Sequence, residues 1–218
     1  GGSFLGKAPV APCRSRLIGI LVPDPDPFFY DIIAALEYRM AMFDYSPVVH
    51  FGLRSPLREE MAIDRMLRRN VAGIIAAPGK DSAAIYTGLQ TPLIFFDNLI
   101  EGMEIPYVIS DDFQAAWSAV EHLISLGHSR IAYIGGNGDH SSFQRLAGYR
   151  AAMEKHGLPL AETYVQAQEY SRQWGYTAAE ILFHLPQPPS AVFCGNDSIA
   201  AGLLRYLLSR NIACPQEV

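Results

Sequence analysis

The sequence alternates between short apolar runs and longer segments with apolar residues at helical spacing. "RLIGILV" (16–22) is typical of a buried strand, and the following segment (28–43) has the period of a helix. The pattern continues with expected strands at 46–51, 71–77, 92–97, 107–110, 130–136, 164–168 and 190–195, and expected helices at 56–70, 81–89, 111–127, 142–157, 172–185 and 197–211. Strands separated by helices pair in parallel through right-handed crossovers. We therefore predict an α/β fold with parallel sheets flanked by helices.

The alternation occurs in two runs, and the break between them falls near Ser110-Asp111. We predict two Rossmann-like lobes, an N-terminal lobe at 16–110 and a C-terminal lobe at 111–218. Residues 1–15 contain two prolines and no sustained apolar period, which predicts a linker that begins with a tag remnant, Gly1-Gly2-Ser3.

Composition excludes several classes of protein. The net charge is −5, which argues against a nucleic-acid-binding surface on this chain. The apolar runs are too short for a membrane span. Three widely spaced cysteines (Cys13, Cys194 and Cys214) form neither a disulfide framework nor a metal motif, and we expect reduced thiols in the cytoplasm.

Motifs of enzymes are missing or weak. The glycine-rich segment "GGNGDHSS" (135–142) lies between a strand and a helix, but its spacing fits neither a dinucleotide fingerprint nor a Walker loop, so a tight turn is favoured over an anion cradle. The sequence has no G-x-S-x-G elbow and no histidines at HExxH spacing. Acidic pairs such as Asp111-Asp112 and Glu59-Glu60 are expected to be caps or solvated faces. We predict no catalytic residue, no metal and no cofactor.

Four stretches resemble the effector-binding core of the lactose-repressor/galactose-repressor (LacI/GalR) family of bacterial transcription regulators. They are "IGILVPDPDPFFYDII" (18–33), "AVEHLISLGHSRIAYIGG" (119–136), "RLAGYRAAMEKHGL" (145–158) and "PSAVFCGNDSIAAGLLRYLLSRNIACPQEV" (189–218). The resemblance implies the periplasmic-binding-protein-like type I fold, with a small molecule in the cleft between two lobes. It also implies dimerisation through first-lobe helices, with 28–43 and 56–70 as candidates.

The resemblance also implies effector-binding residues at the carboxyl ends of the strands, where parallel sheets bind ligands. Arg145 matches an arginine that hydrogen-bonds effector hydroxyls or carboxylates, Asp97 an acidic cleft residue and Asn196 a cleft amide. Tyr170 stands where members often place a ring beneath the ligand, and Phe28 offers an apolar wall. Asp24 and Ser141 are weaker candidates.

Each of these residues also has a structural interpretation. Arg145 can pair with a nearby acid, Asp97 can cap its loop, and the two aromatic rings can belong to the packing of the lobes. Of the two polar residues that follow the strand at 190–195, Asn196 is expected to face the cleft, whereas Asp197 chiefly begins the helix.

Two departures from the family pattern affect these expectations. Asp26 stands where members usually have asparagine, and its added negative charge disfavours an anionic effector. The chain ends at "CPQEV", where members continue, so the C-terminal lobe is expected to be incomplete.

The functional prediction is a small-molecule sensor, most simply for a sugar or sugar derivative, in a cytoplasmic homodimeric regulator. Operator DNA would be bound through an N-terminal helix-turn-helix domain absent from this sequence. The alternative is a sugar-binding receptor for transport or chemotaxis, against which the motif "LGHSRIAYIGG" argues.

Overall fold

The protein consists of two compact units, and its computed structural model describes residues 15–218. The first unit ends at Ile109 and the second covers Ser110–Val218. The boundary predicted from the sequence lies one residue further along, between Ser110 and Asp111. The predicted tag remnant, nearly all of the linker and Cys13 lie outside the described residues.

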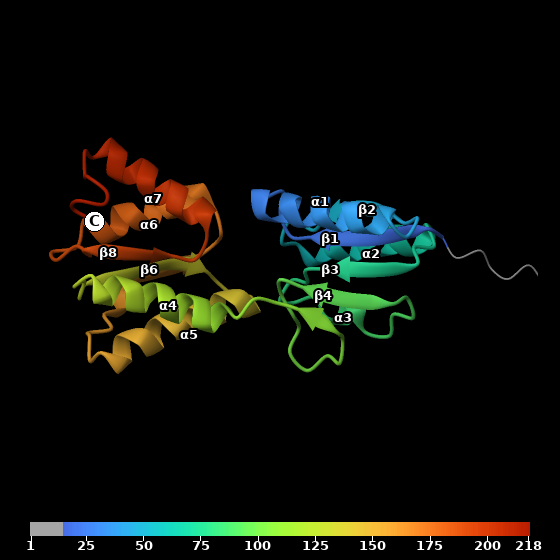
Figure 1. Cartoon of the computed structure of the whole chain (residues 1–218), viewed down its shortest axis with the longest axis horizontal. Coiled ribbons are helices and arrows are strands. Elements are labelled where there is room, and N and C mark those ends of the chain that lie inside the picture. Colours follow the sequence, from blue (N-terminus) through green and yellow to red (C-terminus); the bar gives the residue numbers. More distant parts are fainter. Residues whose placement is uncertain (1–14) are drawn as a thin grey trace, which may run out of the picture. The chain divides into compact units, whose positions relative to one another are not determined.

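The first unit contains a five-stranded parallel sheet in the order β2-β1-β3-β4-β5 (Figure 1). Its strands are β1 (Leu17–Val22), β2 (Ser46–Phe51), β3 (Gly73–Ala76), β4 (Leu93–Phe96) and β5 (Tyr107–Val108). Its helices are α1 (Pro27–Ala41), α2 (Pro56–Arg68) and the short α3 (Ala83–Tyr86).

The second unit contains a three-stranded parallel sheet in the order β7-β6-β8. Its strands are β6 (Ile131–Gly136), β7 (Val165–Gln168) and β8 (Ala191–Cys194). Its helices are α4 (Asp112–Ser125), α5 (His140–Lys155), α6 (Arg172–Phe183) and α7 (Asp197–Ser209), with a 3₁₀ turn, η1 (Glu162–Tyr164), before β7. The predicted α/β fold and the order of its elements are confirmed, and η1 is the element that the sequence pattern did not predict.

Side-chain caps set the starts of five of the seven helices within residues 15–218, and at two of them they explain why the predicted start was wrong. The helix predicted from residue 28 begins at Pro27, because the Asp26 carboxylate accepts a hydrogen bond from the Phe28 amide. The helix predicted from residue 142 begins two residues earlier, because Asp139 forms a capping box with Ser142. The expected cap of α4 is confirmed at Asp111.

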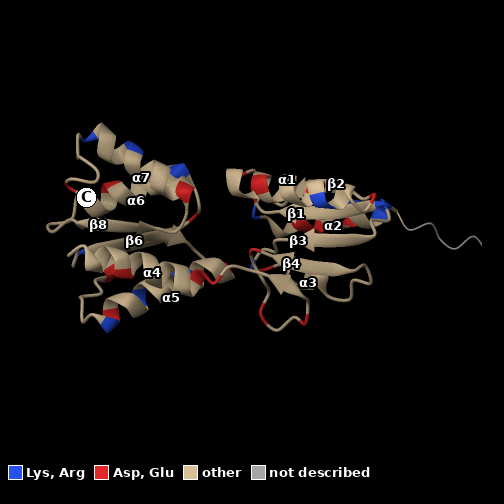
Figure 2. Cartoon of the chain, in the orientation of Figure 1, with Lys and Arg blue, Asp and Glu red and all other residues tan. Residues whose placement is uncertain are grey.

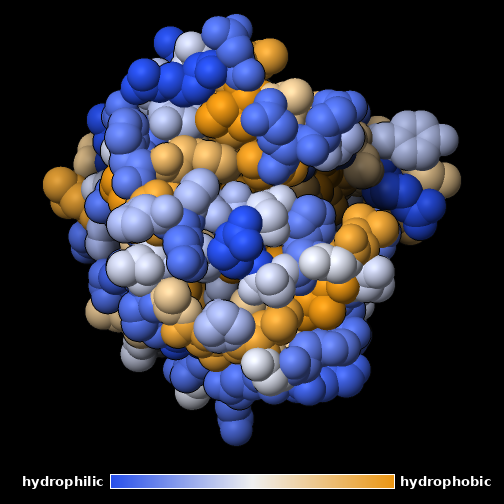
Figure 3. All heavy atoms as spheres, turned by 90° about the vertical axis from the view of Figure 1, so that its left-hand side faces the viewer, coloured by the Kyte–Doolittle hydropathy of each residue, from blue (hydrophilic) through white to orange (hydrophobic). Residues whose placement is uncertain are grey.

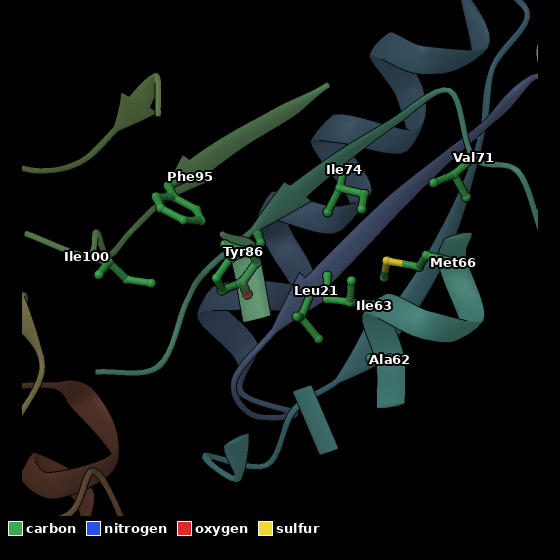
Figure 4. Close-up of a cluster of buried hydrophobic side chains, with 10 residues drawn as sticks. Leu21, Ala62, Ile63, Met66, Val71, Ile74, Tyr86, Phe95 and Ile100 are labelled. Atoms are coloured by element: carbon green, nitrogen blue, oxygen red, sulfur yellow. The ribbon is translucent and has the colours of Figure 1, made fainter. Parts of the chain in front are cut away.

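Both faces of the first sheet are buried by helices. Consecutive side chains of a strand point to opposite faces, so neighbouring residues of β1 pack into different layers. Ile20 and Val22 of β1 pack with α1 and Phe96 on one face. Leu21, between them, packs on the other face with a group from α2, α3 and the other strands that Figure 4 shows: Ala62, Ile63, Met66, Val71, Ile74, Tyr86, Phe95 and Ile100. The two-sided burial explains why β1 is a continuous apolar run rather than an alternating one.

The second sheet is covered in the same way. Ile131 and Tyr133 of β6 pack against α4 and α5, and the intervening Ala132 and Ile134 pack against α6 and α7. All four side chains have less than one per cent of their surface exposed. β6 is therefore the central strand of a three-layer unit. Polar residues lie beyond its carboxyl end.

Glycines allow the helix pairs of the second unit to approach closely. A Cβ atom on Gly148 of α5 would lie 2.3 Å from the Phe113 carbonyl oxygen of α4. On the other face, a Cβ on Gly175 of α6 would lie 2.1 Å from the Ile199 carbonyl oxygen of α7. Real side chains essentially never come so near to backbone, so both helix crossings require the absence of a side chain.

A buried carboxylate organises the end of β3 in the first unit. Glu59 of α2 is 4 % exposed and accepts hydrogen bonds from the hydroxyls of Tyr86 and Ser82, the latter at 2.7 Å. The Gly79 amide also donates to it, at 3.3 Å. The prediction that Glu59 belongs to a cap or a solvated face was wrong, because two donors from the loop after β3 and one from α3 satisfy its oxygens inside the unit.

The surface of the described residues is mixed in character. Figure 2 shows acidic and basic residues interspersed over the elements of both units. The face in Figure 3 is largely hydrophilic, with hydrophobic residues in separate groups. No helix among residues 15–218 is both long enough and apolar enough to cross a membrane.

We expect Gly148→Ala to destabilise the second unit by about 1–3 kcal/mol, because α4 and α5 must move apart to admit the methyl group. Urea unfolding measures the change. Gly52→Ala is the matched control, since a Cβ at Gly52 meets its nearest neighbours at an ordinary 3.8 Å and should change stability little. Equal effects of the two substitutions would contradict the close helix crossing.

We expect the second unit to lose stability as the pH rises from about 10 to 12. Burial raises the pKa of Tyr149 to about 12, from an ordinary value near 10. Its folded state therefore favours the protonated phenol, and the stability that this provides is complete below pH 10 and lost as the pH rises through the folded pKa. Urea unfolding at pH 8 and pH 11 should show a smaller loss in Tyr149→Phe than in the wild type.

Candidate functional site

Candidate residues of the second unit gather at the carboxyl ends of β6 and β8. β6 ends in Gly135-Gly136, and β8 is followed by Gly195, whose amide donates to the Ile134 carbonyl at 2.7 Å. α5 and α7 begin just beyond these strand ends. This is the edge at which parallel α/β sheets bind their ligands.

Arg145 of α5 is fixed across this edge by an ion pair with Asp112 and by hydrogen bonds to Asp112 and Gly195. Its Nε and Nη2 atoms lie 2.9 and 2.8 Å from the Asp112 Oδ1 atom, and its Nη1 donates to the Gly195 carbonyl at 2.6 Å. The Asp112 side chain is only 6 % exposed, so the pair is largely removed from water. The structural interpretation of Arg145, pairing with a nearby acid, is therefore confirmed. A role in effector binding stays a prediction.

Tyr170 lies at the same edge. The Arg145 guanidinium carbon is 5.8 Å from the centre of the Tyr170 ring, within the range of a cation–π contact. A Cβ on Gly136 would meet the ring at 2.3 Å, so the glycine at the end of β6 makes room for it. The family resemblance offered both residues as effector candidates, but the sequence analysis did not predict their contact with each other.

Tyr133 is a polar residue at this edge that the sequence analysis missed. Its hydroxyl is buried and has no hydrogen-bond partner among residues 15–218. A Cβ on Gly135 would lie 2.0 Å from the hydroxyl oxygen, so the ring folds over the end of its own strand. A buried hydroxyl without a partner is energetically costly, and a polar ligand group within reach would remove that cost. The sequence feature that could have indicated this residue is a single tyrosine in an otherwise apolar strand.

The expectation that Asp197 begins the helix is confirmed, and Asn196 has a structural role that the sequence analysis did not predict. Asn196 is the N-cap of α7, and its Oδ1 accepts the Ile199 amide at 2.9 Å. Asp197 is the exposed first residue of the helix rather than its cap. Asparagine takes the cap because its extended backbone lets its amide oxygen reach an amide of the first turn. Contact of Asn196 with an effector stays a prediction.

The glycine-rich segment after β6 is a turn that leads into a capped helix. Gly138 has a left-handed backbone (φ 94°), and Asp139 and Ser142 form the capping box of α5. Ser141, a weaker effector candidate, is 5 % exposed in the first turn of the same helix. The acidic cap occupies the place that an anion would take, which agrees with the interpretation of this segment as a tight turn.

Three candidates lie in the first unit, at the carboxyl ends of β1 and β4. The Asp24 carboxylate forms an ion pair with Arg54. Phe28, in the first turn of α1, is half-exposed and packs edge-on against Phe29, with ring centres 5.1 Å apart. Asp97 follows β4 in a left-handed conformation (φ 62°), and its amide donates to the Val108 carbonyl at 3.0 Å. Such a backbone is uncommon outside glycine and is enriched at functional sites.

The structure thus brings Arg145 and Tyr170 together in the second unit and places Phe28, Asp24 and Asp97 at the corresponding strand ends of the first. Asp26 caps α1, and its effect on the charge of a cleft stays a prediction. Asp112 was expected to be a cap or a solvated acid, which was wrong, because it is buried against Arg145. The sequence offered one indication that Asp112 is not the cap, namely that it directly follows Asp111, the residue that caps the helix.

Metal binding has no support among the described residues. Within residues 15–218, no three or more His, Cys, Asp or Glu side chains are grouped so that they could hold a metal ion. Cys194 and Cys214 are both free thiols, and burial raises the pKa of Cys194 to about 12. That thiol is consequently protonated at neutral pH and a poor nucleophile.

Comparison with known proteins shows what this chain is similar to. It is 29% identical over 210 residues to the HTH-type transcriptional repressor CytR of Escherichia coli, covering 94% of this chain and 62% of that protein. It is 30% identical over 211 residues to the regulator GalR of Salmonella typhimurium, covering 94% of this chain and 61% of that protein. The chain thus spans somewhat less than two thirds of the length of these relatives.

Solved structures of transcription regulators share the fold of this chain. A putative LacI transcriptional regulator from Bacillus cereus superposes with a TM-score of 0.85 at 27% identity, covering 94% of this chain and 76% of that one. The transcription regulator CcpA of Lactococcus lactis, at 23% identity, shares the fold with a TM-score of 0.86, again covering 94% and 76%. The profile of the family described as periplasmic binding proteins and sugar binding domain of LacI family matches residues 15–218. The chain therefore belongs to this family, as an effector-binding core of the LacI/GalR type.

Proposed function

We propose that this chain senses a small, hydroxyl-rich metabolite, a sugar or sugar derivative, on behalf of a transcription regulator. The observation that carries the proposal is the fixed Arg145 guanidinium, held beside Tyr170 at the carboxyl ends of β6 and β8. An oriented guanidinium beside an aromatic ring suits a ring-shaped ligand with hydroxyl groups, because the ring covers the apolar face and the N–H groups donate to oxygens.

The ligand would act by binding two arrangements of the lobes with different affinity. Such a difference biases an equilibrium between them, and an attached helix-turn-helix domain would bind its operator differently in each. Asp24, Phe28, Asp97, Ser141 and Asn196 complete the proposed effector contacts. The chemistry is binding without turnover, in keeping with relatives that are named as repressors.

A homodimer formed through α1 and α2 is also part of the proposal. These helices and the residue that follows α1 expose large apolar side chains: Tyr30, Tyr38, Met42, Leu57 and Met61. Exposed apolar and aromatic side chains of this kind are enriched in protein interfaces. The regulator would work in the cytoplasm, where its operator lies.

The proposed function is tested with the full-length gene product. A thermal-shift panel of sugars, sugar acids and nucleosides identifies the ligand, and calorimetry measures its affinity. Operator fragments selected from random duplex DNA should then bind with an affinity that the ligand changes. Ligand binding without any DNA binding would favour a transport or chemotaxis receptor, and turnover of a ligand would favour an enzyme.

We expect Arg145→Lys to weaken binding of that ligand at least tenfold. Lysine keeps the positive charge beside Asp112 but loses the planar fork that holds oxygens at fixed angles. Arg150→Lys is the matched control: Arg150 lies on the same helix and pairs with Glu162 instead. Unchanged affinity in Arg145→Lys would remove Arg145 from the effector site.

A further inference from the structure

Asp112 occupies an unusual position for an acidic residue of this chain. It is the first residue of α4, and its carboxylate is 6 % exposed. A carboxylate buried to this degree is costly unless a cation and hydrogen bonds compensate it. Arg145 supplies both, since its Nε and Nη2 atoms lie 2.9 and 2.8 Å from the same Asp112 oxygen.

The ion pair with Asp112 also fixes the orientation of Arg145 and balances its charge. The Arg145 side chain is 23 % exposed, and the side of its guanidinium that bears Nε and Nη2 is turned toward Asp112. Its Nη1 atom donates to the Gly195 carbonyl, a neutral dipole whose negative end also faces the cation. Arg145 is therefore held in one orientation, with its charge balanced inside the unit.

The other charged residues at these strand ends do not restore a positive balance. Asp139 caps α5, and Asp197 is the exposed first residue of α7. Glu169 follows β7 and accepts a hydrogen bond from the Ser171 hydroxyl, and the exposed Arg172 begins α6. Together with the Arg145–Asp112 pair, these residues carry four negative and two positive charges.

We infer that Asp112 is a specificity-determining residue, which converts Arg145 from an anion-binding cation into a charge-balanced hydrogen-bond donor. The site then accepts neutral hydroxyl-bearing ligands and rejects phosphorylated or carboxylated ones. The physical reason is that a ligand anion would have to compete with a carboxylate already less than 3 Å from the guanidinium. The inference deepens the proposed function, because it sets the charge of the ligand at the same site.

The test uses the 218-residue chain and inorganic phosphate as the anionic probe, at constant ionic strength with chloride as the other anion. We expect Asp112→Asn to bind phosphate at least about tenfold more tightly than the wild type, because the uncompensated guanidinium would then attract an anion. Isothermal titration calorimetry and ³¹P line broadening measure the affinity. No increase in a folded Asp112→Asn protein would overturn the inference.

Asp197→Asn is the matched control. It removes the same charge at the same end of the sheet, but from an exposed residue that follows the Asn196 cap. We expect it to change phosphate affinity less than twofold. An effect equal to that of Asp112→Asn would mean that the net charge at this end of the sheet, rather than the ion pair with Arg145, controls phosphate binding, and this would overturn the inference. Adding Arg145→Gln to Asp112→Asn should abolish the gain, and a gain that persists would place the anion elsewhere.

Folding of the variants is followed by circular dichroism and urea unfolding. If Asp112→Asn does not fold, Asp112→Ser serves as a second neutral variant with the same expected gain. Asp112→Glu keeps the charge and should show no gain. The outcome is separate from that of the proposed function, because a gain in phosphate binding needs neither an identified effector nor operator binding, and a ligand screen that fails leaves it intact.

Discussion

The burial of both faces of its parallel strands constrains this protein more than any other feature. Side chains from β1 and β6 alternate between two helix layers, so these strands are apolar apart from the Tyr133 hydroxyl. Polar side chains are excluded from the layers and gather where the strands end. The candidate site is a consequence of this exclusion, because Arg145 and Tyr170 lie at the first place beyond β6 and β8 where polar groups can be accommodated.

Glycine contributes to the site by its lack of a side chain. Gly136 leaves the space that the Tyr170 ring fills, and Gly195 offers its carbonyl to Arg145. Gly148 lies one turn beyond Arg145 on α5 and lets that helix approach α4, the helix that begins at Asp112. The close helix crossing and the Arg145–Asp112 ion pair thus connect the same two helices, so the packing of the unit and the geometry of the site are coupled.

The buried carboxylates of Glu59 and Asp112 have different roles. Glu59 accepts hydrogen bonds from the Gly79 amide and from the Ser82 and Tyr86 hydroxyls, and these contacts fix the chain after β3. Asp112 is matched by a cation that also faces the candidate site. The first arrangement stabilises a loop, whereas the second sets the charge that a ligand would meet. Both residues follow or precede a second acid in the sequence, and local pattern alone could not distinguish them from surface acids.

The sequence by itself determined the order of strands and helices, the presence of two units and the Asp111 cap of α4, because these follow from local periodicity and from hydrogen bonds within a few residues. The family resemblance supplied Arg145 and Tyr170 as candidates. Only the tertiary structure decided that Asn196 rather than Asp197 caps α7, that Tyr133 carries a buried hydroxyl, and that Asp112 meets Arg145. Asp112 and Arg145 are 33 residues apart, and no local rule predicts a pairing that depends on how two helices cross.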